Sequence, residues 1–300
     1  MGSFPRSAGA RPLHQAPGRA RWLTLGKRSQ KRFADATTYV LLLGMGLVSI
    51  LPLLWMLSTS LKRSNELYVF PPQFIPAEPT LANYLELARF GILTSLRNSA
   101  IVATSVTLIV VFTSALAGYA FAKLSLPAGE LLFILVLSGL MVPWEVIVIP
   151  LFIFVARLGW SNTFHGIILP MCASPFGVFV MRQFMLSMPS ELLDAARIDG
   201  ASEYGIFSRI VLPLTKPALA ALSTLVFLGA WNNFLWPLLT TSRTDMRVLP
   251  VAIALFKQEF TASYGPMMAA ATVGFLPMLI LYLAFQRYFV QGITLSGLKG

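Results

Sequence analysis

The hydrophobic residues of this 300-residue chain fall into six long runs that are separated by shorter polar stretches. Each run has about the 20 mostly apolar residues that a helix needs to cross the hydrocarbon core of a bilayer. The runs are continuous and do not alternate with period two, which favours helices over a barrel. We therefore expect an all-α polytopic membrane protein. The predicted spans are residues 37–59, 99–122, 131–155, 166–186, 218–240 and 267–289.

The segments outside these runs divide the rest of the chain. Residues 1–35 are rich in Arg, Gly, Pro and Ala, and we expect a disordered basic tail. The first apolar run resembles a signal peptide only in position, since it is longer than the 7–15 apolar residues typical of one, and we expect a retained anchor. Residues 60–98 are predicted to form an external loop and residues 290–300 a short cytoplasmic tail.

Composition supports a membrane location and limits the function. Hydrophobic residues make up 56% of the chain and charged residues 12%, with a mean hydropathy of +0.72. The net charge of +11 does not indicate nucleic-acid binding, because the basic residues gather at the ends of apolar runs and form no basic and aromatic patch. Placing the basic tail in the cytoplasm puts most of the 23 Lys and Arg residues inside, so both termini are expected there.

Few residues offer catalytic or metal-binding chemistry. The single Cys172 excludes an internal disulfide, and His14 and His165 are far apart in the sequence, so we expect no metal site. No Gly-rich loop with a following Lys-Ser or Lys-Thr is present to hold a nucleotide. No catalytic triad or pair of carboxylates is visible either. We therefore expect a chain that is not an enzyme and carries no cofactor of its own.

One internal stretch, residues 189–213, is dense in charge of both signs. Ser190 and Ser202 are each placed to cap a short helix, and Gly200 between them supplies a left-handed turn. Pro213 and Pro217 are expected to end the second helix and redirect the chain into the next span. The exposed side of the first helix then offers small Ala195 and Ala196 between two carboxylates. Two interpretations follow: docking of a soluble partner, or a re-entry helix lying along its own bundle.

The order Asp194-Ala195-Ala196-x-x-Asp199-Gly200-Ala201, followed by Phe207, Ile210 and Leu212-Pro213, resembles the EAA loop of ABC importer permeases. Asp194 stands where that family usually has Glu, so the carboxylate reaches about one methylene less far. In the family this loop is a coupling helix that sits in a cleft of the ATP-hydrolysing subunit. The resemblance implies that role for Asp194, Ala195, Ala196, Asp199, Gly200 and Ala201, with Phe207 and Ile210 as packing residues.

The resemblance extends over most of the chain and narrows the family to carbohydrate permeases of the maltose type. It rests on residues 70–74, 80–84, 98–99, 141–143, 149–152, 230–234 and 285–300. It implies the type I ABC importer permease (MetI-like) fold, with a transmembrane core over residues 95–289. The implied partners are a second homologous permease, two ABC ATPase subunits that bind ATP and magnesium, and an external solute-binding protein. The implied location is a bacterial or archaeal cytoplasmic membrane.

Polar and aromatic residues within the predicted spans are candidates for the path of the solute. Trp144 and Glu145 lie in the third span, and Trp231, Asn232 and Asn233 in the fifth. A carboxylate or amide in lipid needs protein or water around it. Each group can therefore line a polar path or bond to a neighbouring helix without touching solute, and the sequence leaves both readings open.

The resemblance implies import of a sugar or oligosaccharide by alternating access, with a glycerol-phosphate-type solute or polyol as the alternative substrate. Two other classes are less favoured. An ion-coupled secondary transporter usually buries several titratable groups at the midplane, and only Glu145 qualifies here. A membrane enzyme would need catalytic groups that the sequence does not display.

Overall fold

The computed structural model describes residues 20–259 and 264–297, and in these residues it is helical with no strand. It divides into two units, residues 1–55 and 56–300. The α-helices are α1 (Ala20–Ser60), α2 (Ala82–Arg89), α3 (Ile92–Lys123), α4 (Gly129–Ser138), α5 (Trp144–Arg157), α6 (Phe164–Ile168), α7 (Pro175–Leu186), α8 (Ser190–Ile198), α9 (Glu203–Ile206), α10 (Leu212–Leu214), α11 (Lys216–Trp231), α12 (Leu235–Thr240), α13 (Leu249–Glu259) and α14 (Tyr264–Gly297).

Shorter elements join these helices. The 3-10 turns are η1 (Ser64–Glu66), η2 (Gly139–Met141), η3 (Leu169–Met171) and η5 (Thr244–Met246), and η4 (Phe207–Val211) is a π-helix. The all-α fold predicted from the apolar runs is confirmed for the described residues.

The first unit is built on α1, which begins at Ala20, well before the predicted span at residue 37. Helix α1 thus includes residues 20–35 of the stretch expected to be a disordered tail, and residues 1–19 lie outside the described part. The reason is local. The residues that follow Pro17 and Gly18 are mostly good helix formers such as Ala, Arg, Leu, Lys and Gln, so the helix of the span continues backwards through the basic stretch.

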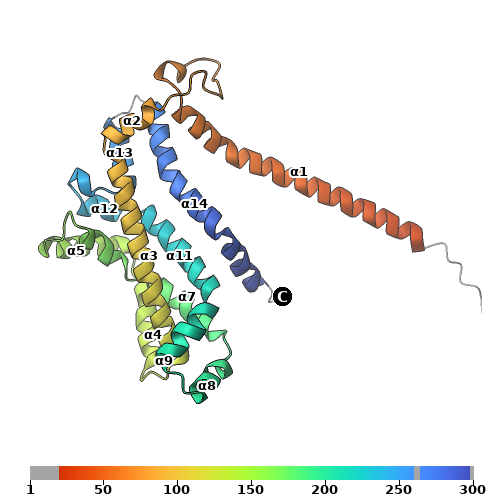
Figure 1. Cartoon of the computed structure of the whole chain (residues 1–300), viewed down its shortest axis with the longest axis vertical. Helices are drawn as coiled ribbons and strands as arrows, with labels where there is room; N and C mark the ends of the chain where they lie inside the picture. Colours follow the sequence, from red (N-terminus) through yellow and green to blue (C-terminus); the bar gives the residue numbers. More distant parts are fainter. Residues whose placement is uncertain (1–19, 260–263, 298–300) are drawn as a thin grey trace, which may run out of the picture. The chain divides into compact units, whose positions relative to one another are not determined.

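Helix α3 is the central element of the second unit. It packs against α7 and α11 along its length, and α14 lies beside α11 (Figure 1). Helix α3 contributes side chains to two buried hydrophobic clusters. Val102 and Val106 belong to one cluster, and Ala115 and Tyr119 belong to the other. In Figure 1, α2 and α13 lie at the N-terminal end of α3, whereas α8 and α9 lie at its C-terminal end, which is Lys123. A rigid α3 therefore connects the two ends of this unit.

Three helices are long and apolar enough to cross a membrane, or up to six if each of three bent helix pairs counts as one span. The third predicted span, 131–155, is such a pair: α4 with η2 and then α5 are bent by 96° at Pro143. The fourth, 166–186, bends by 44° between η3 and α7. Glu203–Leu214 and α11 meet at 76° around Thr215, so the chain turns between Pro213 and Pro217, as predicted. Pro residues lie at or beside each of these bends, where they interrupt the backbone hydrogen bonds of the helix.

The fifth predicted span, 218–240, is also discontinuous. Helix α11 ends at Trp231 and α12 starts at Leu235. Side chains replace the backbone bonds that are lost at such breaks: Asn233 Oδ1 accepts from the Trp236 amide at 3.3 Å, and Ser174 Oγ accepts from the Gly177 amide at 3.1 Å. The indole of buried Trp236 donates to the carbonyls of Gly166 and Ile167, both at 3.1 Å.

The predicted external loop, residues 60–98, contains helix α2 and the first turns of α3, which begins at Ile92 instead of residue 99. Buried Asn83 donates to the carbonyls of Ser60 and Lys62 at 2.8 and 2.9 Å. Asn98 donates to the carbonyls of Asp245 and Arg247 at 2.8 and 3.0 Å. These side-chain amides hold the loop and residues 245–247 against the N-terminal end of α3. The predicted loop is therefore ordered by side-chain hydrogen bonds that apolar periodicity does not reveal.

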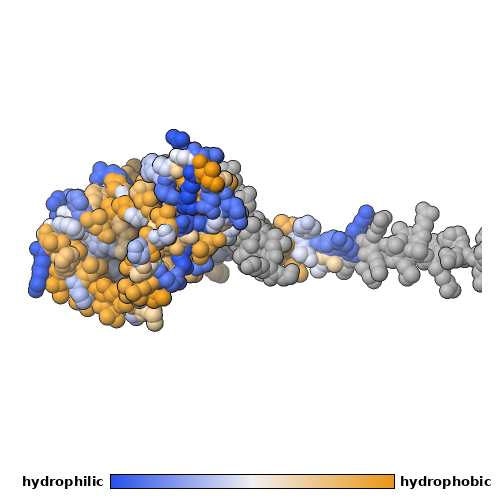
Figure 2. Space-filling model, turned by 90° about the horizontal axis from the view of Figure 1, so that it is seen from below, coloured by the Kyte–Doolittle hydropathy of each residue, from blue (hydrophilic) through white to orange (hydrophobic). Residues whose placement is uncertain are grey.

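The surface of the second unit is largely apolar. Figure 2 shows hydrophobic residues over most of the drawn face, with polar residues gathered in patches. Large side chains such as Leu108, Phe112 and Ile149 are exposed, at 65%, 60% and 64%. Such a surface needs lipid or a partner protein to cover it, as expected of a polytopic membrane protein.

Helices α3 and α7 approach each other closely at Gly118 of α3. A Cβ atom added there would lie 2.7 Å from the Met181 Cβ and 2.9 Å from the Arg182 amide nitrogen of α7. Since neither atom is the end of a flexible side chain, we expect Gly118→Ala to force α3 and α7 apart and to cost about 1–3 kcal/mol of stability. The measurement is the thermal unfolding midpoint of the purified protein in detergent.

The matched control is Gly46→Ala in α1, where an added Cβ would meet no atom within 4 Å. We expect this variant to melt at or above the midpoint of the unsubstituted chain. Equal midpoints for the two variants would show that the α3–α7 contact is looser than described here.

Candidate functional site

The polar segment, residues 189–213, forms two helices that meet at a sharp turn. Gly200 has a φ of +82°, the left-handed conformation predicted for it, and Ser202 accepts from the Gly205 amide at 3.2 Å as the predicted cap of α9. The predicted cap by Ser190 is wrong. Helix α8 starts at Ser190 itself after Pro189, without a side-chain cap. The Ser190 hydroxyl instead lies 3.5 Å from the Lys123 ammonium.

One face of the polar segment is part of the protein core. Leu193, Ile206 and Val211 are buried beside Met181 and Met185 of α7. The ring of buried Phe207 packs 5.3 Å from that of Tyr119 on α3. The predicted packing role of Phe207 thus corresponds to contacts inside this chain, and Ile210 is half-buried beside the same cluster. The segment is therefore fixed to α3 and α7 by apolar contacts.

The opposite face of the segment is exposed and carries most of the predicted coupling residues. Asp194, Ala195, Asp199, Gly200 and Ala201 are exposed, and Ala196 is half-buried. The apolar face of the segment thus lies on its own bundle, as one of the two interpretations expected, while its motif face is exposed and docking of a partner there stays a prediction. Small and acidic residues on a rigid exposed turn suit close contact with a basic partner surface.

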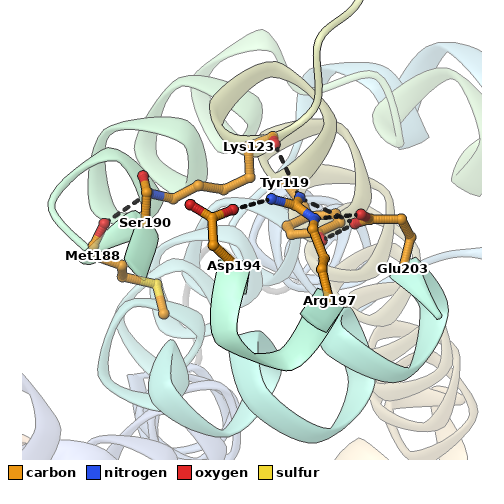
Figure 3. A network of polar contacts seen from close by, with 7 residues as sticks. All are labelled: Tyr119, Lys123, Met188, Ser190, Asp194, Arg197 and Glu203. Atoms are coloured by element: carbon orange, nitrogen blue, oxygen red, sulfur yellow. Dashed lines mark hydrogen bonds and ion pairs between the residues drawn. The ribbon is translucent and has the colours of Figure 1, made fainter. Parts of the chain in front are cut away.

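A polar network fixes the turn to the end of α3 (Figure 3). Arg197 donates from Nη1 to Asp194 Oδ1 and from Nε to Glu203 Oε1, both at 2.7 Å. Glu203 Oε2 also accepts from the Tyr119 hydroxyl at 2.5 Å. Lys123 Nζ donates to the Met188 carbonyl at 2.7 Å. One guanidinium therefore joins α8 to α9 across Gly200, and the same carboxylate joins α9 to α3.

The ionisation of Arg197 and Glu203 follows from these contacts. The hydrogen bonds from Arg197, and then the bond from Tyr119, lower the pKa of the Glu203 carboxyl below its ordinary value. The bonds to Glu203 and then Asp194 raise the pKa of Arg197. Both groups are therefore charged at neutral pH. A folded-state pKa below the unfolded one means that this stabilisation is present at neutral pH and is lost on acidification, as Glu203 becomes protonated.

Sequence reasoning missed the residues of this network other than Asp194. The spacing of Asp194 and Arg197, three residues apart on a helix, was a usable signal for one ion pair. The contact between Tyr119 and Glu203 joins residues 84 positions apart. No local pattern marks such a pair, because it depends on how α9 packs on α3.

A groove of about 360 Å³ in the second unit lies where three helix breaks meet. Trp144 follows the break before α5, Ala173 lies in the break before α7, and Asn233 lies in the break before α12. Breaks in spanning helices are tolerated where they are buried in protein or line a cavity. The remaining lining residues are Val106, Pro170, Met171, Val226, Gly229 and Ala230, so no charged side chain lines the groove.

The groove brings together Trp144 and Asn233 of the five candidate path residues. Trp231 does not line it, since this side chain is 3% exposed and donates to the Gly274 carbonyl of α14 at 3.2 Å. Trp231 therefore bonds to a neighbouring helix in this structure. Glu145 is exposed in the first turn of α5, directly after the bend, and Asn232 is exposed beside Asn233.

The described chain is thus a polytopic helical membrane unit with an exposed polar turn at one end. Its fold is shared with a chain from the crystal structure of a bacterial ABC transporter involved in the import of the acidic polysaccharide alginate. The TM-score is 0.75 over 87% of this chain and 98% of that chain, at 21% identity. Residues 110–295 match the family "Binding-protein-dependent transport system inner membrane component". The chain belongs to this family of ABC importer permeases.

Relatives in this family are similar over most of their length. The arabinooligosaccharides transport system permease protein AraQ of Halalkalibacterium halodurans is 36% identical over 84% of this chain and 92% of the relative. The trehalose/maltose permease protein MalG of Thermococcus litoralis is 35% identical over 85% and 94%. The lactose permease protein LacG of Rhizobium radiobacter is 33% identical over 88% and 96%. The predicted family is confirmed, and with it a permease subunit that is not itself an enzyme.

The turn at Gly200 allows a test of the geometry of the polar segment. A side chain at φ +82° strains the backbone, so we expect Gly200→Ala to cost about 1 kcal/mol although no atom lies within 4 Å of the added Cβ. Gly229→Ala in α11 has the same open space but helical geometry, and we expect it to be neutral or stabilising by up to about 1 kcal/mol. Thermal unfolding of both variants checks this, and a stable Gly200→Ala protein would contradict the turn.

Proposed function

We propose that this chain is a permease subunit of a binding-protein-dependent ABC importer that moves a sugar or oligosaccharide across the cytoplasmic membrane. The observation that carries the proposal is the two-faced polar segment. Its apolar face is buried against α3 and α7, while the Asp194-to-Ala201 motif is exposed on a rigid turn. A segment of this kind can receive a push from a soluble partner and pass it to the membrane helices.

The partner required by this arrangement is a pair of ABC ATPase subunits on the cytoplasmic side, where both termini of the chain also lie. ATP and magnesium bind to those subunits. A second homologous permease completes the path, and an external solute-binding protein delivers the solute to the outer loops. Closure of the ATPase pair drives alternating access, in which the spans rock around a central cavity.

The groove supports a neutral, ring-bearing solute over a phosphate-bearing one. An aromatic face at Trp144 suits the apolar face of a sugar ring, and the Asn233 amide can donate to a hydroxyl. A phosphate would require cationic groups, and the groove has none along its lining. The sugar names of the AraQ, MalG and LacG relatives support the same choice.

Docking of the ATPase is tested by reversing charge on the exposed motif. We expect Asp194→Arg to abolish co-purification of the ATPase subunits, because it replaces an exposed carboxylate with a cation that would face the basic partner surface. Gly200→Pro should have the same effect, because proline cannot adopt the φ of +82°. Asp194→Glu, which restores the family's longer carboxylate, should retain the ATPase.

The control for that experiment is Glu191→Arg, which reverses a charge one turn earlier on α8. It lies outside the motif and should leave co-purification near normal. Membrane insertion of every variant is followed by its yield in the membrane fraction. Normal capture of the ATPase by Asp194→Arg would refute docking at this face.

The groove is tested by Trp144→Ala and Asn233→Ala in the assembled transporter. We expect each to reduce sugar uptake about tenfold, the effect of losing about 1.4 kcal/mol of binding at a ring or hydroxyl, with ATPase capture unchanged. Phe154→Ala removes an exposed aromatic ring from the same helix outside the groove and should retain uptake. Equal uptake by the Trp144 and Phe154 variants would exclude the groove from the path.

A further inference from the structure

The Lys123 end of α3 is bound by charged residues of the polar segment, most of which lie outside the EAA-type motif. Together with two residues of α3, they form a set that we call the Arg197 clamp. It consists of Tyr119, Lys123, Asp194, Arg197 and Glu203 (Figure 3). Apart from Asp194, these residues have no assigned role in the proposed docking face. The clamp links that face to the end of α3.

The clamp joins three helices through two side chains. Arg197 of α8 binds Glu203 of α9 at 2.7 Å, and its Nη2 lies 3.5 Å from the Lys123 carbonyl at the end of α3. Glu203 in turn accepts from Tyr119, one turn before that end, at 2.5 Å. A guanidinium has a planar, rigid set of donors. The angle between α8 and α9 and their position on α3 are therefore set by the same group.

Apolar contacts alone would hold this joint less specifically. Phe207 and Tyr119 pack with their rings 5.3 Å apart at a tilt of 46°, and such contacts tolerate sliding. The polar bonds of the Arg197 clamp are directional, so a displacement of α8 pulls on Lys123 and Tyr119 in a defined direction.

Helix α3 carries a displacement to the other end of the unit. It is one unbroken helix of 32 residues. Near its N-terminal end, Asn98 donates to the carbonyls of Asp245 and Arg247 at 2.8 and 3.0 Å. The neighbouring Ser99 hydroxyl accepts from the Leu249 amide at 2.7 Å. Energetic coupling between distant sites travels through rigid elements and hydrogen-bonded contacts of this kind.

We propose that Tyr119, Arg197 and Glu203 are positioning residues that transmit movement of the docked polar segment to α3, so that ATP hydrolysis is converted into transport. This inference rests on the proposed function, because it requires an ATPase bound at the exposed face. The residues of the clamp touch neither ATP nor solute. Their role is to keep the docking face and α3 moving as one body.

The test uses the complete transporter, with both permeases, the ATPase pair and the binding protein, in proteoliposomes. Sugar uptake and phosphate release are measured together for Arg197→Ala, Glu203→Gln and Tyr119→Phe. We expect each variant to retain the ATPase subunits but to transport about fivefold less sugar per ATP, the effect of about 1 kcal/mol of lost coupling. Stimulation of ATP hydrolysis by the loaded binding protein should fall in parallel.

Matched controls come from the same segment. Arg209→Ala removes an equal charge from an exposed position, and Tyr204→Phe removes the hydroxyl of an exposed tyrosine on α9. Both should keep the normal ratio of sugar to ATP. Arg197→Lys retains the charge without the planar fork and should restore only part of that ratio. The double variant Arg197→Ala/Glu203→Gln should lose no more than either single variant, because one joint is broken in each case.

A purely structural role gives a different result. In that case the clamp variants would lower the yield or the unfolding temperature, while the surviving transporters would keep the normal ratio of sugar to ATP, and this outcome would overturn the inference. Failure of the proposed function is distinguishable, because the unsubstituted chain would then capture no ATPase. Capture of the ATPase with an unchanged ratio in all three variants overturns the clamp alone.

Discussion

The hydrocarbon core of a membrane offers no hydrogen-bond partner to a broken helix, and this constraint shapes the second unit. Helices α4 and α5, η3 and α7, and α11 and α12 are each separated by a break. Ser174 and Asn233 accept from backbone amides freed at two of these breaks. The breaks also lie together around one groove, where solute or water can meet the remaining polar groups. The same constraint that makes irregular backbone costly in lipid therefore gathers it around this groove.

The polar segment is governed by the opposite environment, because it lies outside the apolar runs. Its charges can remain exposed, and its helices are stabilised by Gly200, the Ser202 cap and an ion pair across the turn. Burial of Leu193, Ile206 and Phe207 attaches it to the bundle. Under the proposed function the segment receives work mechanically from a docked ATPase. A turn that is rigid, exposed on one face and buried on the other meets that requirement.

Helix α3 relates these two regions to each other. Its middle borders the groove at Val106, and its Lys123 end is held by Arg197 and Lys123 itself through bonds to the polar segment. Gly118 lets α7 approach α3 closely. The alginate-importer chain shares this fold at 21% identity. The fold is thus compatible with much variation in sequence.

The sequence by itself determined the class of fold, the location of the apolar runs, the turn at Gly200 and the family, because each of these depends on local composition or on closely spaced residues. It also supplied Trp144 and Asn233 as candidates for the groove. It did not give the 96° bend between α4 and α5, the burial of Trp231 against α14, or the helix that continues back to Ala20. Only the tertiary structure joined Tyr119 to Glu203 and Asn98 to Arg247, because those contacts link residues 84 and 149 positions apart. Hydropathy reports how a residue partitions between water and lipid, whereas such pairings depend on the direction in which packed helices point their side chains.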